Sequence, residues 1–370
     1  MKIGVLKEPV PETRVSVLPE HVAILQKWNV DILVETSAGV NAFASDQKYA
    51  EAGAKVVSRN DVLKDSELIL SINFPVPYEV EAIQSKILLG YYQPLHNPAF
   101  VQNLAKKNVT VFSIDMIPRT TRAQSMDVLS SQANIAGYKA VLIAANIFPK
   151  YFPMFMTAAG SIPPAKVLIL GAGVAGLQAI ATARRLGAVV EVFDTRPEVK
   201  EEVMSLGAKF IEVEGAADAS KAGGYAVEQS AEFTQKQKMK IAESVAKSDI
   251  IITTAQIPGK AAPVLITQDM LDTMKNGSVI IDLSAATGGN TSATKNDETV
   301  KYNGVIIVGN SRLAATMPYD ASKMYGKNII NFLQLIIDKE GKINLNFDDD
   351  LVKGTCITHN GQILLGQLAD

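Results

Sequence analysis

The chain contains a glycine-rich segment, GAGVAG at residues 171–176, between an apolar run and an amphipathic run. The preceding run, AKVLIL, has the composition of a buried strand, and the following run, LQAIATARRLG, has helical spacing. In this context G-x-G-x-x-G predicts a strand, a tight turn and a helix whose N-terminus attracts an anion. The segment therefore predicts a parallel α/β sheet with a dinucleotide-binding turn.

Each glycine of this turn has its own expected role. Gly171 permits the tight turn, Gly173 lets the backbone approach a pyrophosphate, and Gly176 lets the helix close on the strand. Asp194 ends the next apolar run, at about the spacing of 20 residues expected for the carboxylate that binds ribose. A carboxylate repels a 2′-phosphate, and nearby Arg196 softens that repulsion, so the sequence favours NAD(H) over NADP(H). A glycine-rich turn without a ligand is the alternative.

Short apolar runs alternate with amphipathic runs on both sides of this motif, which predicts two parallel sheets wrapped by helices. The proline-containing segment 148–166 separates the two series and is expected to be a connection. The expected strands are residues 2–6, 30–35, 67–72, 86–92 and 109–114 in the first series, and 167–173, 189–194, 209–213, 249–255, 278–284 and 305–309 in the second.

A strong helical run at residues 320–338 belongs to neither series by its position, and we expect it to return to the first domain. The expected first domain comprises residues 1–124 and 320–370 and is discontinuous. Residues 125–319, including a long connecting helix, form the expected second domain. The predicted fold class is α/β, with two Rossmann-like, doubly wound parallel sheets.

Charge and cysteine content exclude several functional classes. Lys and Arg number 36 and Asp and Glu 38, so no basic field favours nucleic acid or lipid. Cys356 is the only cysteine, which excludes an internal disulfide framework, and the Cys and His spacings offer no metal site. The uncharged stretch 167–183 is short for a membrane span and is better explained as strand and helix start. No transmembrane segment is expected.

The histidines offer little acid–base chemistry. An ordinary dehydrogenase moves a proton as well as a hydride and therefore needs a general acid or base. Of the three histidines, His21 lies in a helix-start pattern and His359 in a hairpin-like tail, so both are expected to be structural or solvated. His96, in QPLHNP, is the one acid–base candidate, and a loop role explains it equally well.

Five segments carry a resemblance to a known family: RAQSMDVLSSQANIAGYKAV, GAGVAGLQAIATARRLGAVVEVFDTR, AGGYA, TTAQIPGKAAPVLI and SRLAATMPYDASKMYGKNI. Over essentially its full length the chain resembles the NAD(H)-binding alpha subunit (domain I) of proton-translocating NAD(P) transhydrogenase. The start KIGVLKEPVPETRVSVLP is also similar, more distantly, to alanine dehydrogenase.

The similarity to alanine dehydrogenase fails at the positions that matter for catalysis. That family's substrate-binding lysine lies where Ser71 and Asn73 stand here, and its catalytic histidine aligns with Gln93. Arg14 is retained, but without the other two groups it cannot oxidise an amino acid. An alanine-type dehydrogenase with His96 as the base and a non-catalytic NAD-sensing module remain the alternatives.

The transhydrogenase resemblance implies that hydride passes directly from NADH bound here to NADP⁺ on a partner subunit. Transfer between two nicotinamides releases no proton, so the requirement is placement of the rings and not acid–base chemistry. The resemblance assigns this placement to a polar run, residues 119–130, with Gln124 as the first choice for positioning the rings. Asp127 or Ser125 also fits a helix cap. The implied catalytic residues are Arg119, Gln124, Asp127 and Ser130.

The resemblance also implies a set of cofactor contacts. AGGYA, which contains Gly223, is expected to be a loop that closes over the nucleotide, with a plain surface loop as the alternative. The implied NAD(H)-binding residues are Arg119, Thr120, Thr121, Gln124, Gly171, Gly173, Val174, Gly176, Asp194, Thr195, Arg196, Gly224, Tyr225 and Gln256.

The expected partners are membrane-spanning and NADP(H)-binding transhydrogenase subunits, which carry out the coupled proton translocation, and a second copy of this chain in a homodimer. No nucleic acid, no metal and no direct membrane insertion are expected. The implied location is cytoplasmic, peripheral on the cytoplasmic face of the inner membrane through the partner subunits.

Overall fold

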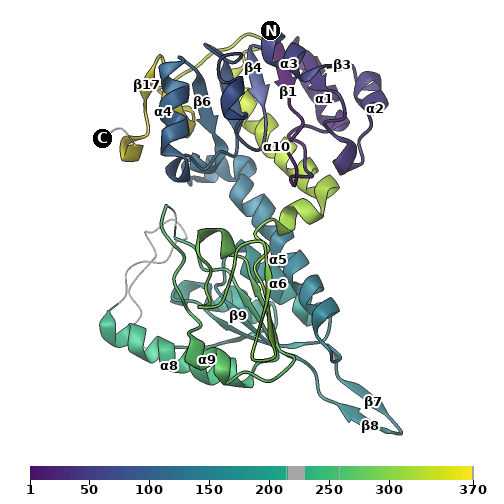
Figure 1. Ribbon diagram of the computed structural model, residues 1–370, viewed down its shortest axis with the longest axis vertical. Coiled ribbons are helices and arrows are strands. Elements are labelled where there is room, and N and C mark those ends of the chain that lie inside the picture. Colours follow the sequence, from purple (N-terminus) through teal and green to yellow (C-terminus); the bar gives the residue numbers. More distant parts are fainter. Residues whose placement is uncertain (214, 216–229, 258, 369–370) are drawn as a thin grey trace. The chain divides into compact units, whose positions relative to one another are not determined.

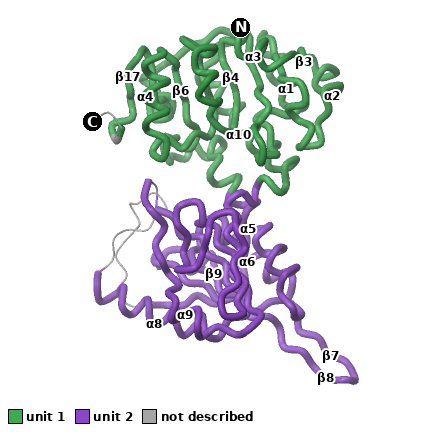
Figure 2. Tube along the Cα trace, in the orientation of Figure 1, with its two compact units in different colours: residues 1–132, 315–370 green, residues 133–314 purple. Residues whose placement is uncertain are grey.

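The computed structural model describes residues 1–213, 215, 230–257 and 259–368. The chain forms two compact units, which Figure 2 distinguishes by colour. Unit 1 comprises Met1–Gln132 and Ala315–Asp370, and unit 2 comprises Ala133–Ala314. Unit 1 is thus assembled from both ends of the chain.

Unit 1 contains a mixed sheet of eight described strands in the order β17-β16-β6-β5-β4-β1-β2-β3. Strands β1 to β6 are parallel, whereas β16 and β17 add an antiparallel edge. The chain runs from β1 outward to β3 and then returns to β4 on the other side of β1, so the winding direction reverses there. The strands are β1 (Lys2–Val5), β2 (Asp31–Glu35), β3 (Lys55–Val57), β4 (Leu68–Leu70), β5 (Ile87–Gly90), β6 (Thr110–Ser113), β16 (Cys356–His359) and β17 (Gln362–Ile363).

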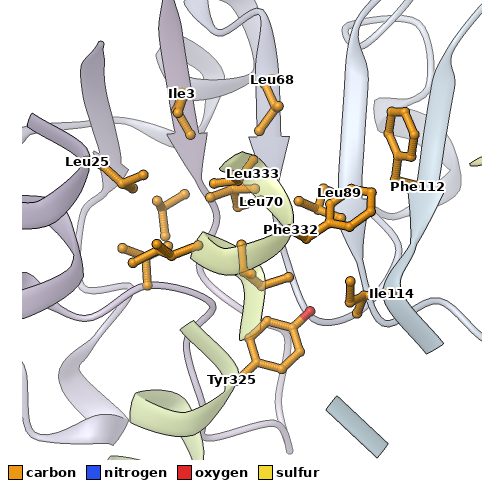
Figure 3. Packing of buried hydrophobic residues seen from close by; sticks show 14 of the residues in the cluster. Ile3, Leu25, Leu68, Leu70, Leu89, Phe112, Ile114, Tyr325, Phe332 and Leu333 are labelled. Atoms are coloured by element: carbon orange, nitrogen blue, oxygen red, sulfur yellow. The ribbon is translucent and has the colours of Figure 1, made fainter. Parts of the chain in front are cut away.

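Helices cover both faces of this sheet. Successive residues of a strand point to opposite faces, so neighbouring residues belong to different apolar clusters. Leu68 and Leu70 belong to one apolar cluster with α10, and Ile69 belongs to the other cluster with α3 and α4. Figure 3 shows Phe332 and Leu333 of α10 beside Leu70 in the first cluster. The helices of unit 1 are α1 (Pro19–Leu25), α2 (Asp46–Glu51), α3 (Arg59–Asp65), α4 (Pro98–Lys106), α10 (Pro318–Ile336) and α11 (Asp350–Thr355).

His21 is buried at the start of α1 and links this helix to α10. Its Nδ1 accepts the N–H of Leu18 at 3.0 Å, and the ring also hydrogen-bonds to the backbone of Lys323. Burial lowers the pKa of His21 to about 4, so the imidazole is neutral at neutral pH. The structural role expected for this histidine matches these contacts.

This histidine is expected to make unit 1 sensitive to acid. Its folded pKa lies below the unfolded value, so its stabilisation is complete above pH 6.5 and is lost as pH falls towards 4. Proton linkage therefore lowers the free energy of unfolding by roughly 2 kcal/mol at pH 5. Urea unfolding can be followed through the fluorescence of the single tryptophan, Trp28. The difference in free energy of unfolding between wild type and His21→Gln should shrink by that amount from pH 7.5 to 5. A gap that is the same at both pH values would contradict the assignment.

Unit 2 contains a sheet of seven described strands in the order β11-β10-β9-β12-β13-β15-β14. All neighbours are parallel except β14, which pairs antiparallel with β15 at the edge. The first strand of the sheet in the sequence, β9, lies between β10 and β12, which marks the reversal point of the winding. The strands are β9 (Lys166–Leu170), β10 (Val189–Phe193), β11 (Lys209–Phe210), β12 (Ile250–Thr253), β13 (Val279–Asp282), β14 (Thr299–Tyr302) and β15 (Val305–Val308).

Helices also cover both faces of the second sheet (Figure 1). Val167 and Ile169 lie in the cluster that contains α5, α6 and α7, and Leu168 and Leu170 lie in the cluster with α8 and α9. A short hairpin of β7 (Phe155–Thr157) and β8 (Gly160–Ile162) precedes the sheet. The helices are α5 (Val128–Ile147), α6 (Val174–Arg185), α7 (Lys200–Ser205), α8 (Ala231–Lys247) and α9 (Gln268–Asp272).

The predicted fold class is confirmed, and the structure adds elements that the sequence pattern did not indicate. The edge strand β3 has only three residues and follows directly from a helical pattern, so its own periodicity is too short to detect. Strand β14 alternates between exposed and half-buried residues at an edge. The segment expected to be a plain connection contains the β7–β8 hairpin. Among the described residues, no helix is long and apolar enough to cross a membrane.

Candidate nucleotide-binding site

The glycine-rich turn lies at the carboxyl end of β9, where the winding of unit 2 reverses. Gly171 has φ +106°, in the left-handed region that favours glycine, and its N–H donates to the carbonyl of Phe193 at 2.8 Å. Gly173 is the N-cap of α6, and no described side chain caps this helix. The N–H groups of the first turn of α6 therefore form an anion-binding end that no described carboxylate occupies.

The three glycines are needed for different reasons. A Cβ on Gly176 would lie 1.9 Å from the carbonyl oxygen of Gly171, so only glycine lets α6 pack this closely on the turn. A Cβ on Gly171 would lie 2.3 Å from the Thr254 hydroxyl of the neighbouring loop. A Cβ on Gly173 would meet no atom of the described residues within 4 Å, and its φ of −75° suits any residue. The described residues thus set no steric limit on a side chain at 173, whereas a ligand that approaches the backbone would.

Asp194 follows β10 and its carboxylate is almost fully buried. One oxygen accepts the N–H of Ala172 at 2.6 Å and the Nη2 of Arg196 at 2.8 Å. The other accepts the backbone N–H and the Nε of Arg196 at 2.8 and 2.9 Å. These four donors occupy the sites that a carboxylate offers, so a ribose hydroxyl can bind Asp194 only if the Arg196 side chain moves. The same hydrogen bonds raise the pKa of Arg196.

The loop after β12 lies at the same edge of the sheet as the loops after β9 and β10. Thr254 donates its N–H to Leu170 at 2.9 Å, which ties the loop to the end of β9. The side-chain amide of Asn290 forms two hydrogen bonds with the backbone of Ala255. It accepts the N–H at 3.1 Å and donates to the carbonyl at 2.9 Å. Gln256 is exposed and donates to the carbonyl of Leu283 at 3.1 Å. Asn290 was not expected from the sequence, where its only signal is the preceding glycine pair.

These three loops carry most of the unit 2 residues assigned to the nucleotide. Because β10, β9 and β12 are adjacent parallel strands, their carboxyl ends bring the loops to one edge of the sheet. Val174 begins α6 and is exposed, and Thr195 lies between the paired Asp194 and Arg196. Gly223, Gly224 and Tyr225 lie outside the described residues.

The polar run of residues 119–130 belongs to unit 1. Thr121–Met126 forms a 3-10 helix, η6, which ends before α5 begins at Val128. Arg119, Thr120, Thr121 and Gln124 are all exposed. Within the described part of the chain, the side-chain amide of Gln124 forms no hydrogen bond, so both its donor and its acceptor are available to a ligand.

Asp127 and Ser130 are engaged with each other at the start of α5. The Asp127 carboxylate accepts the backbone N–H of Ser130 at 2.9 Å and its hydroxyl at 2.6 Å. This is the arrangement of an N-cap residue, so the helix-capping interpretation holds for Asp127. Both side chains remain partly exposed.

Comparison with known proteins identifies the family. The N-terminal domain model of alanine dehydrogenase/PNT matches residues 4–136, and the C-terminal domain model matches residues 140–366. The chain belongs to the alanine dehydrogenase/PNT family. The two matched regions together cover almost the whole chain.

Within this family the chain shares more sequence with transhydrogenase alpha subunits than with an alanine dehydrogenase. It is 42% identical to "NAD(P) transhydrogenase subunit alpha" of Haemophilus influenzae, over 98% of this chain and 71% of that one. The crystal structure of transhydrogenase from Sinorhizobium meliloti matches with a TM-score of 0.90 and 43% identity, over 98% of this chain and 100% of that one. An alanine dehydrogenase of Staphylococcus epidermidis is 26% identical over 100% of this chain and 96% of that one. The chain is therefore a homologue of NAD(P) transhydrogenase alpha subunits.

Ser71, Asn73 and Gln93, where alanine dehydrogenase is expected to carry its lysine and histidine, make internal contacts in unit 1. The Ser71 hydroxyl lies 2.8 Å from the Tyr92 hydroxyl, and the Asn73 amide donates to the buried carboxyl of Glu8 at 2.9 Å. Gln93 donates to the Tyr91 hydroxyl at 2.6 Å. Burial raises the pKa of Glu8 to about 7, so this carboxyl is about half protonated at neutral pH.

Arg14 also has protein partners on all three of its guanidinium nitrogens. Its Nε and Nη2 donate to the two carboxylate oxygens of Glu12 at 2.8 and 2.7 Å, and its Nη1 donates to Gln132 at 2.8 Å. An amino-acid carboxylate would need these donors and would approach two buried glutamates. His96, the acid–base candidate, is exposed at the end of a 3-10 helix, Pro94–His96. This geometry does not support amino-acid oxidation. No group of described residues could hold a metal ion.

Proposed function

We propose that this chain is the NAD(H)-binding alpha subunit of a proton-translocating NAD(P) transhydrogenase. It binds NADH at the carboxyl edge of the unit 2 sheet, and hydride passes directly to NADP⁺ bound on a partner subunit. The proposal rests on two observations together. The chain has a complete dinucleotide-binding turn, and it is 42% identical to a transhydrogenase alpha subunit in an alignment that covers 98% of the chain. The polar run with its exposed Gln124 amide supports it.

The reaction requires no proton transfer by the protein. The bond between the nicotinamide C4 of NADH and one hydrogen breaks with its electron pair, and a C4–H bond forms on NADP⁺. NADH becomes NAD⁺ and NADP⁺ becomes NADPH, so neither side gains or loses a proton. The protein must hold the rings at roughly 3 to 3.5 Å with the donor carbon facing the acceptor. Neutral amides and hydroxyls suit this task because they add no charge beside a ring whose charge changes.

We assign the site residues in two groups. In unit 1, Arg119, Gln124, Asp127 and Ser130 are assigned to the transfer step, and the backbone of Arg119 to Thr121 is assigned to nucleotide binding. In unit 2, the nucleotide contacts are Gly171, Gly173, Val174, Gly176, Asp194, Thr195, Arg196 and Gln256, together with Gly224 and Tyr225.

The proposal includes the assembly. The NADP(H)-binding and membrane-spanning subunits are separate components of the complex, and the coupled proton translocation belongs to them. Two copies of this chain form a homodimer, and the complex holds it on the cytoplasmic face of the inner membrane. The transfer step is tested by mixing the chain with a transhydrogenase NADP(H)-binding domain and NADPH. An NAD⁺ analogue with a distinct reduced spectrum then reports reduction, and no reduction in the full mixture would refute the proposal.

Cofactor selectivity is expected to depend on Asp194. Wild type should bind NADH at least tenfold tighter than NADPH, because the 2′-phosphate meets the Asp194 carboxylate. Asp194→Ala should shrink that ratio, whereas Arg196→Ala, which removes the cation and leaves the carboxylate, should keep or widen it. Equilibrium dialysis with NADH and with NADPH measures the two dissociation constants of each variant. Equal affinities in the wild type would overturn the NAD(H) assignment.

A further inference from the structure

Two asparagines of α10 converge on a single carbonyl of the polar run. Asn328 donates its side-chain N–H to the carbonyl oxygen of Ser125 at 2.9 Å, and Asn331 donates to the same oxygen at 2.8 Å. They are three residues apart and so lie on one face of the helix. Both belong to unit 1 but are about 200 residues from Ser125 in the sequence. The two bonds occupy both lone pairs of that oxygen.

The Ser125 carbonyl needs partners from outside its own segment. It lies in the last turn of η6, and the chain changes direction at Asp127 before α5 begins. At such an end the last carbonyls have no helical N–H to accept. The asparagines supply the donors instead, and Asn328 accepts the Ser131 hydroxyl at 2.7 Å on its other side. Asn328 thus joins η6 to the first turn of α5.

Asparagine is a poor choice for the interior of a helix, because its side chain competes for backbone hydrogen bonds. Asn328 is 5% exposed and lies among apolar residues that pack on the sheet. A buried amide in that position is costly unless it is hydrogen-bonded. Its bonds to Ser125 and Ser131 meet that requirement. The face of α10 that carries Asn328 and Asn331 therefore contacts the polar run and the start of α5.

We infer that Asn328 and Asn331 are positioning residues for hydride transfer, which act by fixing the turn that carries Gln124. The Ser125 carbonyl belongs to the residue directly after Gln124, so a shift of this carbonyl moves the Gln124 backbone with it. The Gln124 side chain has no described hydrogen bond of its own, and its aim depends on the backbone. The inference rests on the proposed function, because it assigns the asparagines to the step that Gln124 serves.

The deciding variant is Asn331→Ala. It removes one donor from Ser125 and leaves the buried Asn328 in place, and alanine is the better helix former, so α10 is preserved. Asn331→Asp keeps the shape and replaces the donor with a carboxylate that the Ser125 carbonyl repels. Gln334→Ala is the matched control, because Gln334 is an exposed amide on the same helix without a described hydrogen bond.

Each variant is mixed with NADH, NADP⁺ and a transhydrogenase NADP(H)-binding domain, and the rate of a single turnover is measured. NADH affinity and thermal unfolding are measured beside it. Asn331→Ala should slow transfer roughly tenfold, less than the hundredfold that a 1 Å misplacement can cost, with NADH affinity changed less than twofold. Asn331→Asp should be at least as slow, and Gln334→Ala should match the wild type. In a Gln124→Asn background, Asn331→Ala should add little, because both changes act through one amide.

Wild-type transfer by Asn331→Ala would overturn the inference. A loss of rate that is matched by an equal loss of NADH affinity would also overturn it, because a general structural role moves both. If the wild-type chain itself transfers no hydride, the proposed function fails first, and that result is distinct from a failure of the asparagine variants alone.

Discussion

Gln124→Asn is expected to slow hydride transfer roughly a hundredfold while leaving NADH affinity within about threefold of the wild type. The substitution keeps the amide but withdraws it by one methylene, on the order of 1 Å, and misplacement on that scale can cost about a hundredfold. The Gln124 side chain is exposed and makes no hydrogen bond to a described residue, so the change should not disturb the fold. A residue used only in the transfer geometry affects the rate and not ground-state binding.

Single-turnover transfer with an NADP(H)-binding domain, together with NADH titration, separates these two effects. Gln102→Asn on α4 is the matched control, because it makes the same chemical change at an exposed position outside the polar run. It should leave rate and affinity unchanged. If Gln124→Asn transfers hydride at the wild-type rate, the positioning role of this residue is wrong.

Gly173→Ala and Gly176→Ala are expected to fail in different ways. At Gly173 the new methyl meets no atom of the described residues, so the variant should unfold close to the wild-type temperature. The methyl enters the space proposed for the pyrophosphate, and overpacking of about 1 to 3 kcal/mol corresponds to roughly five- to 150-fold weaker NADH binding. At Gly176 the methyl would lie 1.9 Å from the carbonyl oxygen of Gly171, so α6 must move and the protein should lose stability even without nucleotide.

Thermal unfolding without ligand and NADH titration of both variants give the comparison. The decisive result is from Gly173→Ala, because no described residue is in steric conflict with its methyl group. Wild-type NADH affinity in this variant would mean that no ligand approaches the turn at this residue, and the nucleotide site would have to lie elsewhere.

Much of the fold could be predicted from local sequence. The central parallel strands, such as β9, β12 and β13, are continuous apolar runs because both of their faces are buried, and α10 has a clear helical period. The glycine-rich turn after β9 was predictable because Gly171 has a positive φ and Gly176 packs too closely on the turn for a side chain. The edge strands β3 and β14 are short and half exposed, so they leave little pattern.

The contacts that tune the site were beyond sequence reasoning. Nothing local indicates that Arg196 would occupy all the free positions of Asp194, although the residues are two apart. The bonds from Asn328 and Asn331 to Ser125 join segments about 200 residues apart, which only the folded unit brings together. The roles assigned to Gln124 and Arg119 came from family resemblance and stay predictions.

Hydride is proposed to pass directly from NADH on this chain to NADP⁺ on a partner. An isotope experiment supplies NADH that carries deuterium at the transferred C4 position, together with NADP⁺, the chain and an NADP(H)-binding domain of a transhydrogenase, in ordinary water. Direct transfer predicts that NADPH forms only when both proteins are present and that it carries the deuterium with almost no loss to solvent. NADPH that contains solvent hydrogen, or no NADPH in the complete mixture, would contradict it.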